Sequence, residues 1–154
     1  MTGPLYLEDL PVGLEVTTAR RTLTEADVVA FAGISGDFNP LHMDEQFVRE
    51  RTPFRGRIAH GLLVLSISSG LHSELDGVES VAYLEVQREF VAPAYPGDTI
   101  RARWKVEEAR PSRSRPGTGV VRFHVDVVNQ DGDVIQRGTD VWLVSARPNG
   151  GQEG

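Results

Sequence analysis

The chain has 154 residues, of which 40% are hydrophobic and 25% are charged, enough for one hydrophobic core but few for two domains. Its net charge of -6 argues against nucleic acid or an anionic membrane surface as a partner. The absence of cysteine excludes disulfides, thiolate nucleophiles and cysteine metal sites, and is typical of a reducing compartment.

The chain shows no targeting or membrane-spanning pattern. The first residues, MTGPLYLEDLPVG, lack the basic and apolar regions of a secretory signal, and the longest apolar run, 62–65, is far too short to span a bilayer. We therefore expect a cytoplasmic protein. We expect a single domain over 1–147 and a flexible C-terminal tail over 148–154, PNGGQEG, which has almost nothing to bury.

The first predicted elements are a short strand over 14–20 and an amphipathic helix that follows it. Thr24 is the expected N-cap of this helix, and Asp27 three residues later gives a capping-box pattern. Gly33 and Gly36 are expected to end the helix and to allow the backbone angles of a turn.

The bend over 35–44, SGDFNPLHMD, contains a carboxylate, a carboxamide, a proline and an imidazole. Asn39 followed by Pro40 is a helix-start signal, because Asn caps free amides and Pro fits the first helical position. The residues alone leave two interpretations open. In one, Asp37 caps a backbone amide and His42 is an exposed first-turn residue. In the other, the stiff turn holds both groups toward one point, where they share acid and base duties.

Two further helices are expected after this bend. The first covers 44–50, and a loop over 51–57 then leads to the tripeptide AHG at 59–61. The segment 62–75 is apolar or small almost all round, which predicts a helix enclosed by other elements.

Strands are predicted for the remainder of the chain. Segments rich in β-branched and aromatic residues predict strands over 81–90, 99–109, 118–129 and 134–144. Proline and glycine separate them, and Asp131-Gly132 is the strongest hairpin signal. We expect the four strands to pair consecutively as an antiparallel meander. The predicted fold is α+β, with the sheet wrapped around one buried hydrophobic helix.

The four histidines lie in different settings. His124 alternates with hydrophobic neighbours on a strand and is expected on the solvent side, whereas His72 suits a helix C-terminus. His60 directly precedes a helix, so it either lines a site or ties down a loop. There is no His-x-x-x-His pattern and no cysteine pair, so no metal site is predicted. Ser66 lies in a helical pattern without a Gly-x-Ser-x-Gly elbow, and its small size suits close approach by the sheet or an acyl chain.

Taken in order, SGDFNPLH at 35–42, AHG at 59–61 before an apolar helix, and the strands resemble the MaoC-like, (R)-specific enoyl-CoA hydratase family, which has the hot-dog fold. The resemblance extends from about 22 to 144. It implies that Asp37 and His42 form a catalytic dyad for reversible addition of water to a trans-2-enoyl-CoA. It also implies that the backbone amide of Gly61 serves as oxyanion donor, with Asn39, His60 and Ser66 in support.

The resemblance further implies a homodimer or dimer-based oligomer that binds an acyl-CoA thioester, with CoA as part of the substrate and no separate cofactor. Arg113 and Arg115 lie in the basic segment 108–117 and are candidates for binding the CoA phosphates. A solvated hairpin tip or a dimer contact explains that segment equally well, and Arg55 and Arg57 are weaker candidates.

Two other functions remain open on the same fold. An acyl-CoA thioesterase generally needs a carboxylate on the central helix, and the segment 61–73 contains neither Asp nor Glu. A non-catalytic acyl-CoA-binding subunit would keep the pocket without using the dyad.

Overall fold

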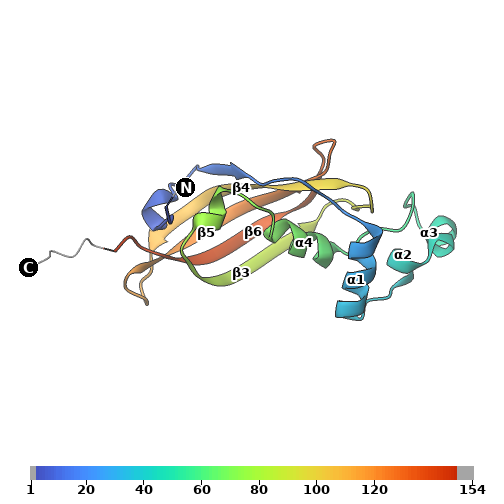
Figure 1. Cartoon of the computed structure of the whole chain (residues 1–154), viewed down its shortest axis with the longest axis horizontal. Helices are drawn as coiled ribbons and strands as arrows, with labels where there is room; N and C mark the ends of the chain where they lie inside the picture. The colour runs from blue at the N-terminus through green and yellow to red at the C-terminus, as the bar shows by residue number, and fades with distance from the viewer. Residues whose placement is uncertain (1–2, 149–154) are drawn as a thin grey trace, which may run out of the picture.

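A six-stranded antiparallel sheet forms the body of the protein in the computed structural model, which describes residues 3–148 (Figure 1). The strands are β1 Glu15–Thr17, β2 Arg21–Thr22, β3 Ser80–Phe90, β4 Thr99–Pro111, β5 Thr118–Val128 and β6 Val134–Ser145. The helices are η1 Leu7–Asp9, α1 Glu25–Ser35, α2 Pro40–Met43, α3 Glu45–Arg51, α4 Gly61–Ser69 and η2 Glu74–Gly77. Apart from Pro148, the tail expected at 148–154 lies outside the described residues.

The order of the strands differs from the predicted meander. The sheet runs β1-β4-β5-β6-β3, so β4, β5 and β6 pair consecutively, whereas β3 pairs with β6. The prediction that β3 pairs with β4 is therefore wrong. The linker 91–98 contains two prolines and is too long and stiff for a tight hairpin, so it crosses to the other side of the meander.

The first helix forms as predicted. The side chain of Thr24 accepts a hydrogen bond from the Asp27 amide, and the Asp27 carboxylate accepts one from the Thr24 amide, which completes the capping box. α1 continues through Gly33, so the expectation that this glycine ends the helix is wrong. The helix ends at Ser35, and its C-cap Gly36 has a φ of 77°, in the left-handed region that glycine adopts readily. The main chain therefore turns sharply into the polar bend.

The central helix is shorter than predicted. α4 ends at Ser69, and Ser73 then caps the separate turn η2, so the predicted helix over 62–75 is wrong beyond Ser69. Gly70 follows the last helical residue and favours this stop. His72 consequently lies outside the helix, where its ring contacts the Asp76 carboxylate, and the predicted role at a helix C-terminus is wrong.

The core lies between one face of α4 and the sheet. Leu63 and Val64 of α4 belong to the same buried cluster as Trp104 and Phe123 on β4 and β5. The opposite face of α4 is open: Leu62 is 57% exposed, so the prediction of a fully enclosed helix is wrong for the single chain. His124 lies on β5 near Asp126, partly exposed, as expected for a solvent-side strand residue.

An ion pair is buried where β3 meets β6. The Arg88 guanidinium donates to the Asp140 carboxylate at 2.7 Å, and the Tyr83 hydroxyl donates to the other carboxylate oxygen. The side chains of Arg88 and Asp140 are 2% and 0% exposed. Burial raises the pKa of the Asp140 carboxyl, although both donors favour its charged form. This pair ties the edge strand to the sheet.

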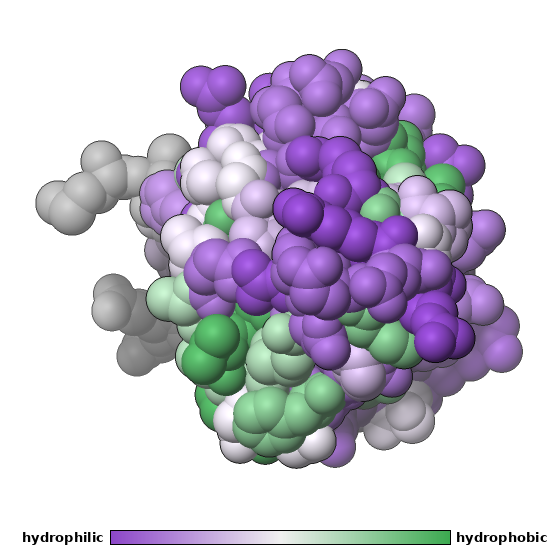
Figure 2. Space-filling model, turned by 90° about the vertical axis from the view of Figure 1, so that its right-hand side faces the viewer, coloured by the Kyte–Doolittle hydropathy of each residue, from purple (hydrophilic) through white to green (hydrophobic). Residues whose placement is uncertain are grey.

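The helices α1, α2 and α3 gather at one end of the sheet, and the β4–β5 hairpin lies at the other (Figure 1). The surface at the helical end is mainly hydrophilic, with a large area of hydrophobic residues at the lower left of the view and a smaller one at the upper right (Figure 2). Exposed apolar side chains on or next to α1 include Val29, Ile34 and Phe38. Among the described residues, no helix has the length and apolar character that crossing a membrane requires.

Candidate active site

The polar bend is held by its own side chains. Asn39 caps α2, with its Oδ1 accepting a hydrogen bond from the Leu41 amide at 3.0 Å. Asp37 Oδ1 accepts a bond from the Asn39 amide at 3.2 Å, which leaves the other carboxylate oxygen free to face the site. Pro40 occupies the first helical position as predicted. Asn39 therefore shapes the turn that separates Asp37 from His42.

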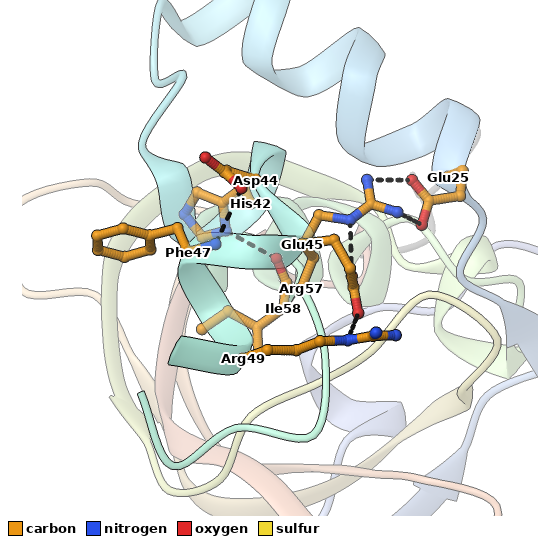
Figure 3. A network of polar contacts seen from close by, with 8 residues as sticks. All are labelled: Glu25, His42, Asp44, Glu45, Phe47, Arg49, Arg57 and Ile58. Carbon is orange, nitrogen blue, oxygen red and sulfur yellow. Dashed lines mark hydrogen bonds and ion pairs between the residues drawn. The ribbon is translucent and has the colours of Figure 1, made fainter. Parts of the chain in front are cut away.

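The imidazole of His42 is buried and has a defined orientation. Its Nδ1 lies 2.7 Å from the carbonyl oxygen of Ile58, shown as a dashed line in Figure 3. Because a carbonyl only accepts, Nδ1 carries the hydrogen, and Nε2 of the neutral ring holds the free lone pair. Nε2 is 3.8 Å from Asp37 Oδ2. The two candidate groups are therefore brought together, with their free atoms facing each other.

The separation of these atoms suits a bridging water better than a direct hydrogen bond. A distance of 3.8 Å is too long for an N–H···O bond. A water oxygen about 2.8 Å from each atom forms a triangle whose angle at the water is roughly 85°, near enough to a water's own geometry for two bonds. The Asp37 side chain is 51% exposed and that of His42 is 10% exposed, so the water position lies at the boundary between solvent and interior.

His60 packs against the interior side of the bend. Its ring stacks on that of His42 with centroids 3.7 Å apart, and its Nε2 donates to the Asp37 carbonyl oxygen at 2.9 Å. His60 is 3% exposed and is not among the residues that line the cavity, so of the two roles that the sequence left open it has the second, tying down the loop. Possible ligand atoms of Asp37, His42 and His60 lie within 4.8 Å of one another. However, the rings of His42 and His60 stack face to face, whereas the ligands of a metal ion converge on it.

A cavity of about 340 Å³ opens beside His42. It lies between the start of α4, the loop before it, and the ends of β3 and β6. Its lining is mostly apolar and comprises His42, Phe54, Ile58, Ala59, Gly61, Val64, Phe90, Val91, Ala92, Pro93, Ala94, Ile135 and Gln136. An apolar cavity with a few polar groups at one end is typical of a small-molecule site.

Gly61 is where the cavity meets the N-terminus of α4. The first amides of a helix have no acceptor within it, and His60 supplies no side-chain cap, so the Gly61 amide is available to a ligand. A Cβ at Gly61 would lie only 2.8 Å from the Phe90 ring, so this position suits glycine. The buried side chain of Gln136 donates to the Gly61 carbonyl at 2.7 Å and fixes the start of the helix to β6.

Other residues predicted for the site lie elsewhere. Ser66 is exposed, donates to the Leu62 carbonyl and does not line the cavity. Arg113 and Arg115 lie at the tip of the β4–β5 hairpin, and the cavity is near the β5–β6 turn at the opposite end of the sheet. The part of β4 from Arg101 to Pro111 alone extends about 33 Å, ten rises of about 3.3 Å each. Neither arginine reaches the cavity of its own chain.

The sequence did not identify three contributors to the site. Phe90 and Gln136 line the cavity, and the Ile58 carbonyl orients His42. Gln136 had no distinct signal, because the polar residues Arg137, Thr139 and Asp140 follow it on the same strand. Phe90 looks like any strand residue, and a backbone carbonyl has no sequence signal.

Comparisons of the sequence and of the structure with known proteins agree on one family. A family model described as MaoC like domain matches residues 10–129. A 3-hydroxybutyryl-CoA dehydratase of Methylorubrum extorquens is 39% identical over 132 residues, covering 85% of this chain and 82% of that protein. The solved structure of an (R)-hydratase from A. caviae has 30% identity and a TM-score of 0.72, covering 91% of this chain and 99% of that one.

The fold is supported by a more distant structure. A Mycobacterium tuberculosis protein described as a double hotdog fold gives a TM-score of 0.78 at 21% identity, covering 99% of this chain and 47% of that chain. At this identity the likeness concerns the fold alone. The predicted hot-dog fold is confirmed, with one sheet packed on a short central helix.

Proposed function

The chain belongs to the MaoC-like domain family, and from this premise we propose that it is a hydro-lyase acting on acyl-CoA thioesters. The proposed reaction is the (R)-specific, reversible addition of water to a trans-2-enoyl-CoA, which in reverse dehydrates a 3-hydroxyacyl-CoA. The observation that carries the proposal is the facing pair Asp37 Oδ2 and His42 Nε2, 3.8 Å apart beside a mostly apolar cavity.

In the proposed mechanism, Asp37 and His42 hold one water between them. The water oxygen bonds to Cβ of the enoyl group while one of its protons passes to the dyad. The electron pair of the double bond moves toward the thioester, and a proton from the dyad is then delivered to Cα. One proton leaves the water and one reaches carbon, so the dyad ends as it began. Acid–base assistance of this kind contributes roughly a hundredfold to ten-thousandfold in rate.

The Gly61 amide is proposed to stabilise the charge that develops on the thioester oxygen. Its position at the N-terminus of α4 adds the positive end of the helix dipole to the hydrogen bond. The reaction requires no cofactor besides the CoA carried by the substrate. Asn39 and His60 are proposed to hold the turn in place rather than to react.

We also propose that the active form is a homodimer joined through β3. This strand pairs on one side with β6, and within residues 3–148 no strand pairs with its other side. Its exposed apolar side chains are Val81, Tyr83, Leu84, Val86 and Phe90. A long apolar edge strand is normally covered, and a second copy would extend the sheet across the interface.

In this dimer the basic β4–β5 hairpin of one copy can serve the cavity of the other. A second groove adjoins the cavity at Ala92 and Pro93. Its charged residues are three carboxylates, Asp98, Asp131 and Asp133, and one cation, Arg55. This excess of negative charge makes it a poor environment for phosphates. In an antiparallel pairing of two β3 strands, the hairpin of one copy comes to the cavity end of the other. Arg113 and Arg115 are therefore proposed to contact the CoA phosphates across the dimer.

The proposal is tested with crotonyl-CoA, following loss of the conjugated enoyl absorbance and, in parallel, release of free thiol. Asp37→Asn and His42→Ala are each expected to abolish hydration while the thermal melting curve stays close to that of the wild type. Retained turnover in both variants refutes the dyad.

The same assay separates the other functions. Thiol release without hydration would identify a thioesterase, although α4 contains no Asp or Glu. Binding of the CoA ester with neither reaction would identify a non-catalytic subunit.

A further inference from the structure

We propose that Arg57 is a positioning residue for His42. Together with Glu25 and Glu45 it forms a loop clamp that fixes the Ile58 carbonyl, and this carbonyl orients the imidazole. The inference rests on the proposed function, because it concerns the geometry of the proposed dyad. The clamp lies outside the cavity and contacts none of the reacting atoms.

The contacts of Arg57 join three parts of the chain. Its Nη1 and Nη2 donate to the two carboxylate oxygens of Glu25 on α1 at 3.1 and 2.9 Å, and its Nε donates to Glu45 on α3 at 3.1 Å (Figure 3). The two parallel hydrogen bonds to Glu25 and the third bond to Glu45 hold the guanidinium in one orientation. The Arg57 backbone is therefore fixed relative to both helices.

The residue after Arg57 carries this restraint to the imidazole. The Ile58 amide donates to the Leu41 carbonyl at 3.1 Å, and the Ile58 carbonyl accepts from His42 Nδ1 at 2.7 Å. The segment 52–60 contains neither helix nor strand, so no regular hydrogen-bond ladder fixes the direction of this carbonyl. The Ala59 amide, which shares a peptide plane with the Ile58 carbonyl, donates to the Ala94 carbonyl at 2.7 Å, and the clamp adds three side-chain hydrogen bonds at Arg57 on the other side of Ile58.

The electrostatics favour a geometric role over a large contribution to stability. The hydrogen bond from Arg57 lowers the pKa of Glu45, and the same bond raises the pKa of Arg57, so the clamp remains charged near neutral pH. The Arg57 side chain is 28% exposed, and partly exposed ion pairs contribute little to the free energy of unfolding. Loss of the clamp should therefore change the loop more than the overall fold.

The expected effect is on turnover. If the Ile58 carbonyl moves, the imidazole loses its fixed tautomer and Nε2 no longer faces Asp37. A displacement of about 1 Å at a reacting group can cost a hundredfold in rate. Arg57→Gln is therefore expected to lower kcat for hydration between roughly tenfold and a hundredfold, with KM changed much less. Arg57→Lys keeps the charge but loses the fork, so it should recover only part of the activity.

Arg49→Gln is the matched control. Arg49 also donates to Glu45 at 3.1 Å, but it lies on α3, is 64% exposed and has no link to the loop (Figure 3). The Arg49→Gln variant, like Arg57→Gln, removes a positive charge that is paired with Glu45. Its kcat is expected to stay within about twofold of the wild type. Glu25→Gln retains the guanidinium and weakens only the fork, so it offers a second variant if Arg57→Gln does not fold.

A direct measurement of the imidazole completes the test. In protein with ¹⁵N-labelled histidine, the wild type and Arg49→Gln should show one His42 tautomer with a protected Nδ1 proton. Arg57→Gln and Glu25→Gln should show faster exchange of that proton or a mixture of tautomers. An unchanged His42 signal, or equal kcat values for Arg57→Gln and Arg49→Gln, overturns the proposal. If the wild type has no hydratase activity, the proposed function fails, while the imidazole signal still decides the role of the clamp.

Discussion

Replacing Gly61 with alanine tests the contact between the start of α4 and the end of β3. The added Cβ would lie 2.8, 2.9 and 3.0 Å from three carbons of the Phe90 ring, closer than carbon atoms normally approach. Either the ring or the first turn of α4 must move. Phe90 is 55% exposed and can shift partly into solvent, but both residues line the cavity, so either movement changes the site.

Gly61→Ala is expected to affect the stability of the protein much less than its kcat. Overpacking costs about 1–3 kcal/mol, and replacing glycine by alanine in a helix returns about 0.5–1 kcal/mol. The net destabilisation is therefore about 0–2.5 kcal/mol, which a domain with about 5–15 kcal/mol of stability tolerates. Displacing an oxyanion donor, by contrast, costs roughly a hundredfold to a thousandfold in kcat. We expect Gly61→Ala to fold and to be almost inactive.

The assay is hydration of crotonyl-CoA by Gly61→Ala, by Phe90→Ala and by the double variant. Removing the ring relieves the close contact, so the double variant should regain most of the kcat of Phe90→Ala. Wild-type kcat and KM in Gly61→Ala would refute the reasoning, because the cavity would then tolerate a methyl group beside the proposed donor. A double variant as inactive as Gly61→Ala would show that the ring is not the cause.

Three further predictions concern regions outside this contact. Arg113→Ala and Arg115→Ala are expected to raise KM for the CoA ester more than they lower kcat, and unchanged saturation kinetics would leave the hairpin a scaffold role only. Asp140→Ala should lower the free energy of unfolding in urea by about 3–5 kcal/mol, because Arg88 would remain buried without its partner; a loss below about 1 kcal/mol contradicts this. The hydrogen bond from the clamp arginine lowers the pKa of Glu45, so its stabilisation is present above the ordinary value of 4.5 and is lost as the pH falls through the lowered value. In Glu45→Gln, Tm should therefore fall less steeply as the pH is lowered below about 4.5 than in the wild type. An unchanged dependence of Tm on pH would show that Glu45 does not contribute to the loss of stability in acid.

Local chemistry accounts for the parts of the fold that the sequence predicted well. The capping box at Thr24 and the Asn39-Pro40 helix start depend on neighbours within three residues, and both formed as expected. Strand segments were located to within a few residues because alternation and turn residues are local signals. The predicted pairing of the first long strand failed, since a linker with two prolines can join strands that are not neighbours.

The candidate site shows the same division. The stiff turn left two interpretations of Asp37 and His42 open, and the resemblance to the MaoC-like family favoured the pair; the structure brings their free atoms to 3.8 Å. Ser66 was included because it lies on the central helix, yet the angle of α4 turns it away from the cavity. Gln136 and Phe90 come from strands more than 25 residues away from Gly61, and only pairing of those strands brings them to it.

The sequence by itself determined the polar bend, its caps, the glycine before the central helix and the strand segments, because each depends on short-range sterics and hydrogen bonds. Tertiary structure alone decided which strand lies at the edge, where the cavity ends, and which carbonyl fixes the tautomer of His42. These features depend on contacts between distant segments, and backbone groups that make such contacts are identical at every residue.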